Sequence, residues 1–226
     1  MSFDGDLYPT AGATKVITTQ GDIVRGDASG NRERLGIGSN LQQLQSNGTT
    51  LSWQTISGGG AWSSLGTDVL TSTNTTMSVT LSSQKKYLMV LANRIANGAL
   101  DNEQIRFNGS SDSDYSFRHA TDGAGDSTNV NIGGIYINAT NATQNGYLYG
   151  FVINDLATSP KMGYFHDMRT TATFDSSTAP QRQLAIGKWQ PSSGTNVAIT
   201  AISLTTAGGG DYQIGSSLAI LGSDGD

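Results

Sequence analysis

The sequence contains no cysteine. This absence excludes disulfide bonds, thiolate catalysis and cysteine-based zinc sites. Histidine is scarce as well, with only His119 and His166, and both lie in strand-like runs, where we interpret them as packing or surface residues rather than catalytic bases. The motifs of serine hydrolases, P-loop proteins and metalloproteases are also missing. The sequence therefore predicts a protein that is not an enzyme and that needs no metal or cofactor.

Charge is low too. Charged residues make up 14% of the 226-residue chain, and the formal net charge is -5. A nucleic-acid partner is not expected, because such binding draws most of its non-specific affinity from a positive field. No run approaches the roughly 20 apolar residues that span a bilayer, and the start, "MSFDGDLYPTAG", lacks the basic and apolar regions of a signal peptide. We expect no membrane span and no secretion signal.

What the chain does contain is glycine, serine, threonine and asparagine. These residues form turns and favour short strands over long surface helices. The one weak helical candidate, residues 93–104, is interrupted by Asn97-Gly98, and we interpret it as a loop. The composition predicts an all-β protein.

The pattern changes along the chain, and it predicts four segments. Residues 1–20 are polar and weakly patterned, as in an arm that becomes ordered on a partner. Residues 21–57 alternate short apolar groups with turn signals, residues 58–61 carry a glycine-rich linker, and residues 62–226 contain regularly spaced strand-like runs. Strands as short as those in 21–57 have no core of their own, so we expect several chains to intertwine there and share one.

Residues 62–226 predict a β-sandwich of jelly-roll type with about ten strands. In "NGYLYGFVIND", Tyr147, Tyr149, Phe151 and Ile153 alternate with residues 148, 150 and 152, and both sets are apolar. This pattern is typical of a strand that is covered on both faces. In "NVAITAISLTT" the apolar set changes parity between residues 199 and 202, which predicts a β-bulge.

The segment from Gly21 to Trp53 resembles a repeat-like stem segment of tailed-bacteriophage fibre and virion-surface proteins. The residues that carry the resemblance are Gly21-Asp22-Ile23-Val24, then Arg34-Leu35-Gly36-Ile37-Gly38-Ser39, then Leu44, Ser46-Asn47-Gly48 and Trp53. The chain departs from the family's form at Leu41, where glycine is usual. The runs "YLMVLANRI", "IRFNGSSDSDYS", "AITAISLTT" and "IGSSLAILG" are similar to the jelly-roll heads of many phage virion proteins.

The resemblance implies a homotrimer with an N-terminal arm, an intertwined trimeric β stem and a jelly-roll head. The residues expected to line the stem's shared axis are Ile23, Leu35, Ile37, Leu44, Leu51 and Trp53. The function it implies is structural: a capsid decoration or head-fibre protein, located on the virion after assembly in the host cytoplasm and attached by its arm to a capsid or tail protein. The alternative is a tail fibre whose head binds host surface glycans. A depolymerase would need a longer, repetitive chain with paired carboxylates.

Several short motifs have two interpretations. Arg25-Gly26-Asp27 is an adhesion signal in other settings, but here it lies in a variable turn of the stem segment, and we interpret it as a coincidence. The acidic loops at Asp112, Asp114, Asp122 and Asp126 indicate turns, with calcium binding as the alternative. Five Asn-x-Ser/Thr sequons, at Asn47, Asn74, Asn108, Asn138 and Asn141, are interpreted as turn chemistry rather than glycosylation sites. The aromatic residues Trp62, Trp189, Tyr115, Tyr164 and Tyr212 fit core and interface packing better than a sugar-stacking platform.

Overall fold

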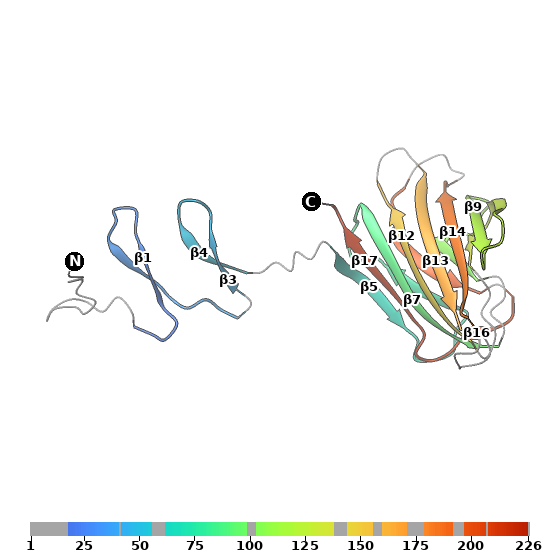
Figure 1. Cartoon of the computed structure of the whole chain (residues 1–226), viewed down its shortest axis with the longest axis horizontal. Helices are drawn as coiled ribbons and strands as arrows, with labels where there is room; N and C mark the ends of the chain where they lie inside the picture. Colours follow the sequence, from blue (N-terminus) through green and yellow to red (C-terminus); the bar gives the residue numbers. More distant parts are fainter. Residues whose placement is uncertain are drawn as a thin grey trace. The chain divides into compact units, whose positions relative to one another are not determined.

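The structure is a computed structural model, and it describes residues 18–40, 42–55, 62–98, 103–137, 144–155, 160–170, 179–191, 197–206 and 208–225. All regular elements in these ranges are β-strands, which confirms the predicted fold class (Figure 1). The chain divides between Gly59 and Gly60 into two compact units. Residues 1–17 of the predicted arm and the predicted linker, residues 58–61, lie outside the described ranges.

The N-terminal unit consists of two antiparallel hairpins. Strand β1 (Ile23–Gly26) pairs with β2 (Arg32–Leu35), and β3 (Gln42–Ser46) pairs with β4 (Leu51–Thr55). Gly30 and Gly48 adopt φ values of +81° and +86° in the connecting turns, a conformation that glycine adopts without strain. No residue in the ranges 18–40 and 42–54 is buried, so neither hairpin has a core within one chain.

The second unit is a two-layer β-sandwich. Its larger sheet has the strand order β10-β9-β14-β13-β12-β7-β17-β5, and its smaller sheet has the order β11-β8-β15-β6. The strands are β5 (Ser63–Val69), β6 (Thr76–Thr80), β7 (Tyr87–Asn97), β8 (Gln104–Phe107), β9 (Tyr115–Thr121), β10 (Ser127–Ile132), β11 (Ile135–Tyr136), β12 (Asn145–Ile153), β13 (Lys161–Arg169), β14 (Gln181–Trp189), β15 (Ala201–Thr205), β16 (Asp211–Tyr212) and β17 (Ser217–Ser223). Strand β16 pairs with β7 beside the larger sheet.

The topology of this unit is that of a jelly roll, as the sequence predicted. Strands β5, β17, β7 and β12 are neighbours in one sheet, and β6, β15, β8 and β11 are neighbours in the other, so the chain crosses repeatedly between the two layers. Strands β13, β14, β9 and β10 extend the first sheet beyond β12. The larger sheet is therefore much wider than the smaller sheet that packs against it.

Two local predictions differ from the structure. Strand β7 continues through Asn97, so the segment interpreted as a loop from residue 93 is a strand for its first part. The prediction of a β-bulge near residues 199–202 is also wrong. Strand β15 begins only at Ala201 and pairs in uninterrupted register with β6, so the change of parity marks the strand's start. Register shifts occur instead at Val130/Ile132 and Ile220/Leu221.

The core lies between the two sheets. Phe107 of the smaller sheet contacts Trp189 of the larger sheet edge to face, with ring centroids 5.8 Å apart, and Tyr115 stacks on the same indole at 6.3 Å. The Tyr115 hydroxyl accepts a hydrogen bond from the Phe107 amide at 2.7 Å, and burial raises the pKa of Tyr115 to about 12. Gly187 on β14 allows Ile135 of the opposite sheet to approach closely, since an added Cβ would lie 2.7 Å from Cγ1 of Ile135.

Candidate functional site: interaction surfaces of the stem and the head

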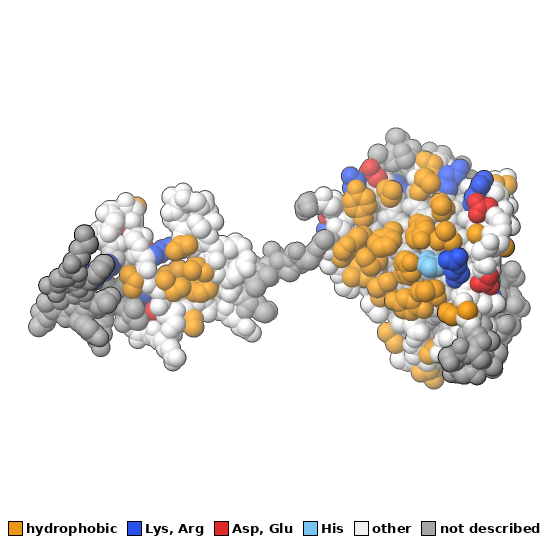
Figure 2. All heavy atoms as spheres, viewed as in Figure 1, with side chains coloured by type: hydrophobic (Ala, Val, Ile, Leu, Met, Phe, Trp, Pro, Cys, Tyr) orange, Lys and Arg blue, Asp and Glu red, His pale blue; other side chains and the backbone are white. Residues whose placement is uncertain are grey.

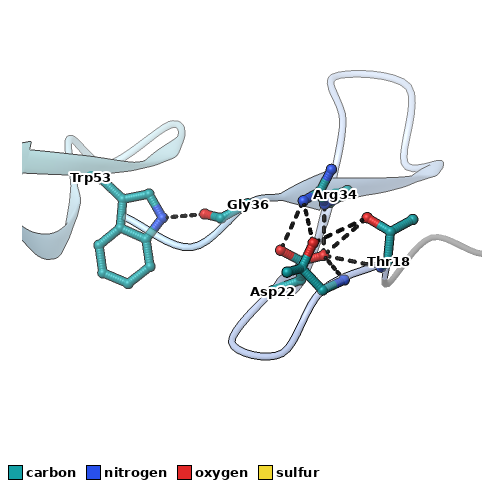
Figure 3. A network of polar contacts seen from close by, with 6 residues as sticks. Thr18, Asp22, Arg34, Gly36 and Trp53 are labelled. Carbon is teal, nitrogen blue, oxygen red and sulfur yellow. Dashed lines mark hydrogen bonds and ion pairs between the residues drawn. The ribbon is translucent and has the colours of Figure 1, made fainter. Parts of the chain in front are cut away.

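Polar contacts hold the N-terminal unit in shape, and they involve the residues of the stem motif. Asp22 forms a bidentate ion pair with Arg34, with Nε–Oδ2 and Nη2–Oδ1 distances of 2.7 and 3.1 Å. The same carboxylate accepts hydrogen bonds from the amides of Thr18 and Thr19 at 3.0 and 2.8 Å (Figure 3). The Arg34 hydrogen bond, with those two amides, holds the pKa of Asp22 well below its usual range. The Gly-Asp and Arg-Leu parts of the motif are therefore partners in the fold.

The glycines of the motif make room for its large side chains. A Cβ on Gly38 would lie 2.6 Å from Cδ2 of Trp53, and one on Gly21, whose φ is +90°, would lie 2.7 Å from Cδ1 of Ile37. The Trp53 indole Nε1 donates a hydrogen bond to the Gly36 carbonyl at 2.6 Å, which joins the second hairpin to the segment that follows the first (Figure 3). Any side chain at Gly38 would push the indole out of this position.

The charged residues of Arg25-Gly26-Asp27 are engaged inside the same unit. Arg25 pairs with Glu33 across the hairpin at 3.1 Å and donates to the Leu51 carbonyl of the second hairpin. The Asp27 carboxylate accepts hydrogen bonds from the amides of Ser29 and Asn31, each at 2.8 Å. Both side chains therefore stabilise the hairpin and its turn. Gly26 and Asp27 are exposed, so the interpretation of this motif as a coincidence stays a prediction.

The six residues predicted to line a shared axis lie on the hairpins and the segment between them, and none is buried in one chain. Ile23 faces Leu35 across the first hairpin, and Leu44 faces Trp53 across the second, so each pair shares one face. Leu51 lies two residues before Trp53 on the same face of β4. Ile37 is 63% exposed and Leu44 is 37% exposed. The structure pairs Ile23 with Leu35 and Leu44 with Trp53, and the described residues leave all six at least partly exposed, so their role in a trimer stays a prediction.

The outer face of the larger sheet in the head is also apolar. Two rows of side chains cross five neighbouring strands, β14, β13, β12, β7 and β17. One row is Ile186–Tyr164–Phe151–Met89–Leu221, and the other is Leu184–His166–Tyr149–Leu91–Ala219. Figure 2 shows this face as a broad apolar area with charged groups gathered near its margin. We call this surface the apolar face.

The side chains of the apolar face are well exposed. Seven large residues are 38–52% exposed: Tyr147, Phe151, Ile153, Met162, Tyr164, Leu184 and Ile186. The sequence predicted that β12 is covered on both sides. In one chain the prediction is met only on the inner side, where Leu148 and Val152 are buried, while the side with Phe151 is open.

A groove of about 360 Å³ lies in the apolar face. Trp62 packs edge to face on Phe151 at 5.9 Å, and these two residues, with Ile153, Met162, Tyr164 and Ile186, line the groove. Its walls are almost entirely apolar side chains. Arg118, Arg182 and Lys188 are exposed on the β14 and β9 strands, where they place positive charge beside the apolar rows.

The sequence analysis did not single out most of this face. Among the predicted aromatic residues, Trp189, Tyr115 and Tyr212 are core residues, as favoured, while Trp62 and Tyr164 belong to the apolar face. The signal that could have revealed the face is the two-sided apolar pattern of β12, repeated more weakly in β13 and β14. Each of those strands alternates buried with exposed residues, and many of the exposed ones are apolar.

The other candidate residues have structural partners. His166 lies on the apolar face, where its Nδ1 and the Tyr149 hydroxyl are 2.8 Å apart, and the His119 ring packs against Phe117. Asp122 accepts a hydrogen bond from the Arg182 amide, and Asp126 lies 3.5 Å from Arg118. No group of three or more histidines and carboxylates that could hold a metal occurs in the described ranges. The same ranges contain no helix long and apolar enough to cross a membrane.

Three of the sequons have defined roles. The side-chain oxygen of Asn74 accepts a hydrogen bond from the Thr76 amide at 3.2 Å. The side-chain oxygen of Asn47 accepts hydrogen bonds from the amides of Thr49 and Thr50 at 2.9 and 2.7 Å. Asn108 binds the backbone of residues 198, 200 and 201 through its side-chain amide. These contacts match the predicted turn chemistry, and Asn138 and Asn141 lie outside the described ranges.

A buried charge cluster lies at one end of the head's core. The Arg94 guanidinium pairs with Glu103 at 2.8 Å and with Asp167, and the Tyr212 hydroxyl donates to Glu103 at 3.1 Å. The side chains of Arg94, Glu103 and Asp167 are 0–1% exposed. Gly146 on β12 leaves the space that the guanidinium occupies. The cluster joins β7, β13 and β16 to Glu103, the residue before β8, and so pins one end of the sandwich.

Burial controls protonation in this cluster. It raises the pKa of Asp167 to about 6, although Arg94 acts in the opposite direction, and it also raises the pKa of Tyr212. Oδ2 of Asp167 has no hydrogen-bond partner among the described residues, which also favours the protonated form. The cluster lies inside the core, so we assign it to stability rather than to binding.

The comparisons with known proteins add no family to this description. No protein-family model, curated protein or solved structure matches the chain.

Proposed function

We propose that this chain is a non-enzymatic, homotrimeric surface protein of a tailed-bacteriophage particle. In this proposal the N-terminal residues attach to the virion, the two hairpins form a stem with two further copies, and the jelly-roll head projects from the particle. The favoured role is capsid decoration or a head fibre. The stem motif from Gly21 to Trp53 supports the phage assignment through its resemblance to fibre and virion-surface proteins.

The observation that carries the proposal is the lack of a core in the N-terminal unit. No apolar residue in the ranges 18–40 and 42–54 is buried. The Asp22 side chain is 0% exposed, but it is the charged partner of Arg34, while Ile23, Leu35, Ile37 and Leu44 stay partly or largely exposed. Two-stranded hairpins with so little burial are marginal in water. Association of three copies would bury these patches against one another and would make stem folding and trimer assembly a single event.

The stem can be tested with charged substitutions in the full chain. We expect Leu35→Asp with Ile37→Asp to turn a trimer into a monomer, because carboxylates cannot be buried on a shared apolar axis without a large cost. Val24→Asp is the matched control: Val24 is 41% exposed on the opposite face of β1, opposite Arg34. Sedimentation equilibrium gives the mass of each variant. A Leu35→Asp, Ile37→Asp protein that stays trimeric would contradict the stem assignment.

The alternative function is a tail fibre that binds host surface glycans. The observation that favours it is the aromatic content of the apolar face, where Tyr147, Tyr149, Phe151 and Tyr164 lie on adjacent strands, since sugar rings stack on aromatic side chains. The copy number per purified particle separates the two roles. Decoration requires many copies spread over the shell, whereas a tail fibre is present in a few copies.

A further inference from the structure

None of the described residues of the head covers its apolar face, and the face is large enough to form a protein interface. Its seven most exposed large side chains, at roughly 150–250 Å² each when fully exposed, present on the order of 600 Å² of apolar surface. Patches on monomeric proteins rarely exceed about 300–600 Å². The half-buried residues of the two rows, Met89, Leu91, Tyr149 and Leu221 among them, bring the face close to the roughly 800 Å² that each partner contributes to a stable protein interface.

The chemistry of the face favours a protein surface over a glycan or a charged ligand. Its central rows contain no Asp, Glu, Lys or Arg, and the groove beside Trp62 and Phe151 is almost entirely apolar. Glycan sites need several polar groups that converge on the sugar hydroxyls. Arg118, Arg182 and Lys188 place charge along one side of this apolar centre, and an apolar centre with a charged margin is the usual anatomy of a protein interface.

In the proposed trimer, chain connectivity keeps the other two heads within reach of this face. Seven residue steps separate Thr55, the last residue of β4, from Trp62, which packs on Phe151 in the apolar face. An extended chain spans at most about 3.6 Å per residue, so these steps cover no more than about 25 Å. Once stems associate, each head is tethered close to its neighbours at an effective concentration on the order of millimolar.

We propose that the heads of one trimer pack against each other through the apolar face. The central residues of this contact are Phe151, Tyr164 and Ile186, which are direct neighbours across β12, β13 and β14. The stem brings the heads close together, and the heads then bury apolar surface by packing through the apolar face. Isolated heads therefore need not associate strongly. This inference rests on the trimer of the proposed function and extends the subunit contact from the stem to the head.

The absence of cysteine makes a direct test available in the full chain. A single cysteine is introduced as Tyr164→Cys, at a position that is 38% exposed in one chain, and its reaction rate with a monofunctional maleimide is measured. We expect labelling to be at least about tenfold slower in the trimer than in the same protein carrying Leu35→Asp and Ile37→Asp, because a thiol in an interface reacts only when the interface opens. Ile214→Cys is the control: Ile214 is 63% exposed and lies outside the face, so its rate is expected to be the same in both backgrounds.

The outcomes separate this inference from the proposed function. A trimeric mass with equal labelling rates of Tyr164→Cys in both backgrounds would overturn the proposed head contact but not the proposed stem. The apolar face would then bind a different partner. A monomeric mass of the unsubstituted chain would overturn both proposals. Circular dichroism of each variant shows that the head is folded, so slow labelling cannot be attributed to misfolding.

Discussion

Removing the Arg94 side chain tests how the head is held together. Arg94→Leu keeps an apolar side chain in the core but leaves Glu103 and Asp167 without the cation that lies 2.8 Å from Glu103. All three side chains are 0–1% exposed, so bulk water does not solvate the two carboxyl groups. Breaking a buried ion pair by removing one partner costs about 3–5 kcal/mol, because the remaining charge is buried without compensation. For a unit of this size, that loss lowers Tm by roughly 6–20 °C.

The effect should depend on pH. The pKa of Asp167 is raised from its usual 3.8 to about 6, so the folded head binds this proton more tightly than the unfolded chain does. The stability that this proton contributes is complete below about pH 4 and is lost as the pH rises through about 6. Without Arg94 the Asp167 carboxyl favours the protonated form still more, so we expect the Arg94→Leu protein to lose more stability at pH 8 than at pH 5.

Urea unfolding at both pH values, followed by near-ultraviolet circular dichroism, measures these differences. Arg118→Leu is the matched control. Its side chain is 62% exposed and its ion pair with Asp126 spans 3.5 Å, so its loss should change the free energy of unfolding by no more than about 0.5 kcal/mol. An Arg94→Leu head within about 1 kcal/mol of the unsubstituted protein, or one with the same loss at both pH values, would refute this reasoning.

Two further substitutions test the packing of the head and the turn of the stem. Gly187→Ala should destabilise the head by about 1–3 kcal/mol, because the new methyl group meets Ile135 of the opposite sheet. Adding Ile135→Val to Gly187→Ala should recover part of the lost free energy of unfolding, as measured by urea unfolding. Gly125→Ala is the control: a Cβ there meets no atom within 4 Å, so the free energy of unfolding should not change. Strictly additive effects of Gly187→Ala and Ile135→Val would argue against the close contact. The Asp27 carboxylate accepts hydrogen bonds from the amides of Ser29 and Asn31 at 2.8 Å, so Asp27→Ala should speed hydrogen exchange at these two amides. Unchanged exchange would contradict the role given to Asp27.

Much of the head could be predicted from the sequence. The alternation of "NGYLYGFVIND" identified β12 and divided its residues correctly between two faces, because the strand period of two is a local property. The strand's partners could not be predicted in the same way. Pairing of β12 with β7, over 50 residues earlier in the chain, depends on the whole arrangement of the sandwich. The same limit explains the apolar face, which exists only because five strands from distant parts of the chain align their exposed apolar residues.

The buried charge cluster was not predicted at all. Arg94 is flanked by Asn93 and Ile95 and gave no sign of burial, while Glu103 and Asp167 are separated from it by 9 and 73 residues. Glycine gave the only local clue. Gly146 breaks the apolar pattern of β12 where the guanidinium needs room, but the reason is visible only once β7 and β12 are side by side.

In the stem, the motif residues that carried the resemblance prove to contact each other: Asp22 with Arg34, Gly38 with Trp53, and Gly21 with Ile37. The motif thus has a physical meaning within one chain. It fixes two small hairpins whose apolar residues stay at least partly exposed, and the proposed trimer would cover these residues. The number of chains in that stem is a property of the assembly, and the contacts within one chain do not determine it.

The most direct test of this account is the mass of the unsubstituted chain in solution. Sedimentation equilibrium at micromolar concentration should give three times the chain mass of 23.6 kDa, with no monomer on dilution until the stem unfolds. A single, folded species with the mass of one chain would contradict the central claim that the N-terminal unit completes its core only with other copies.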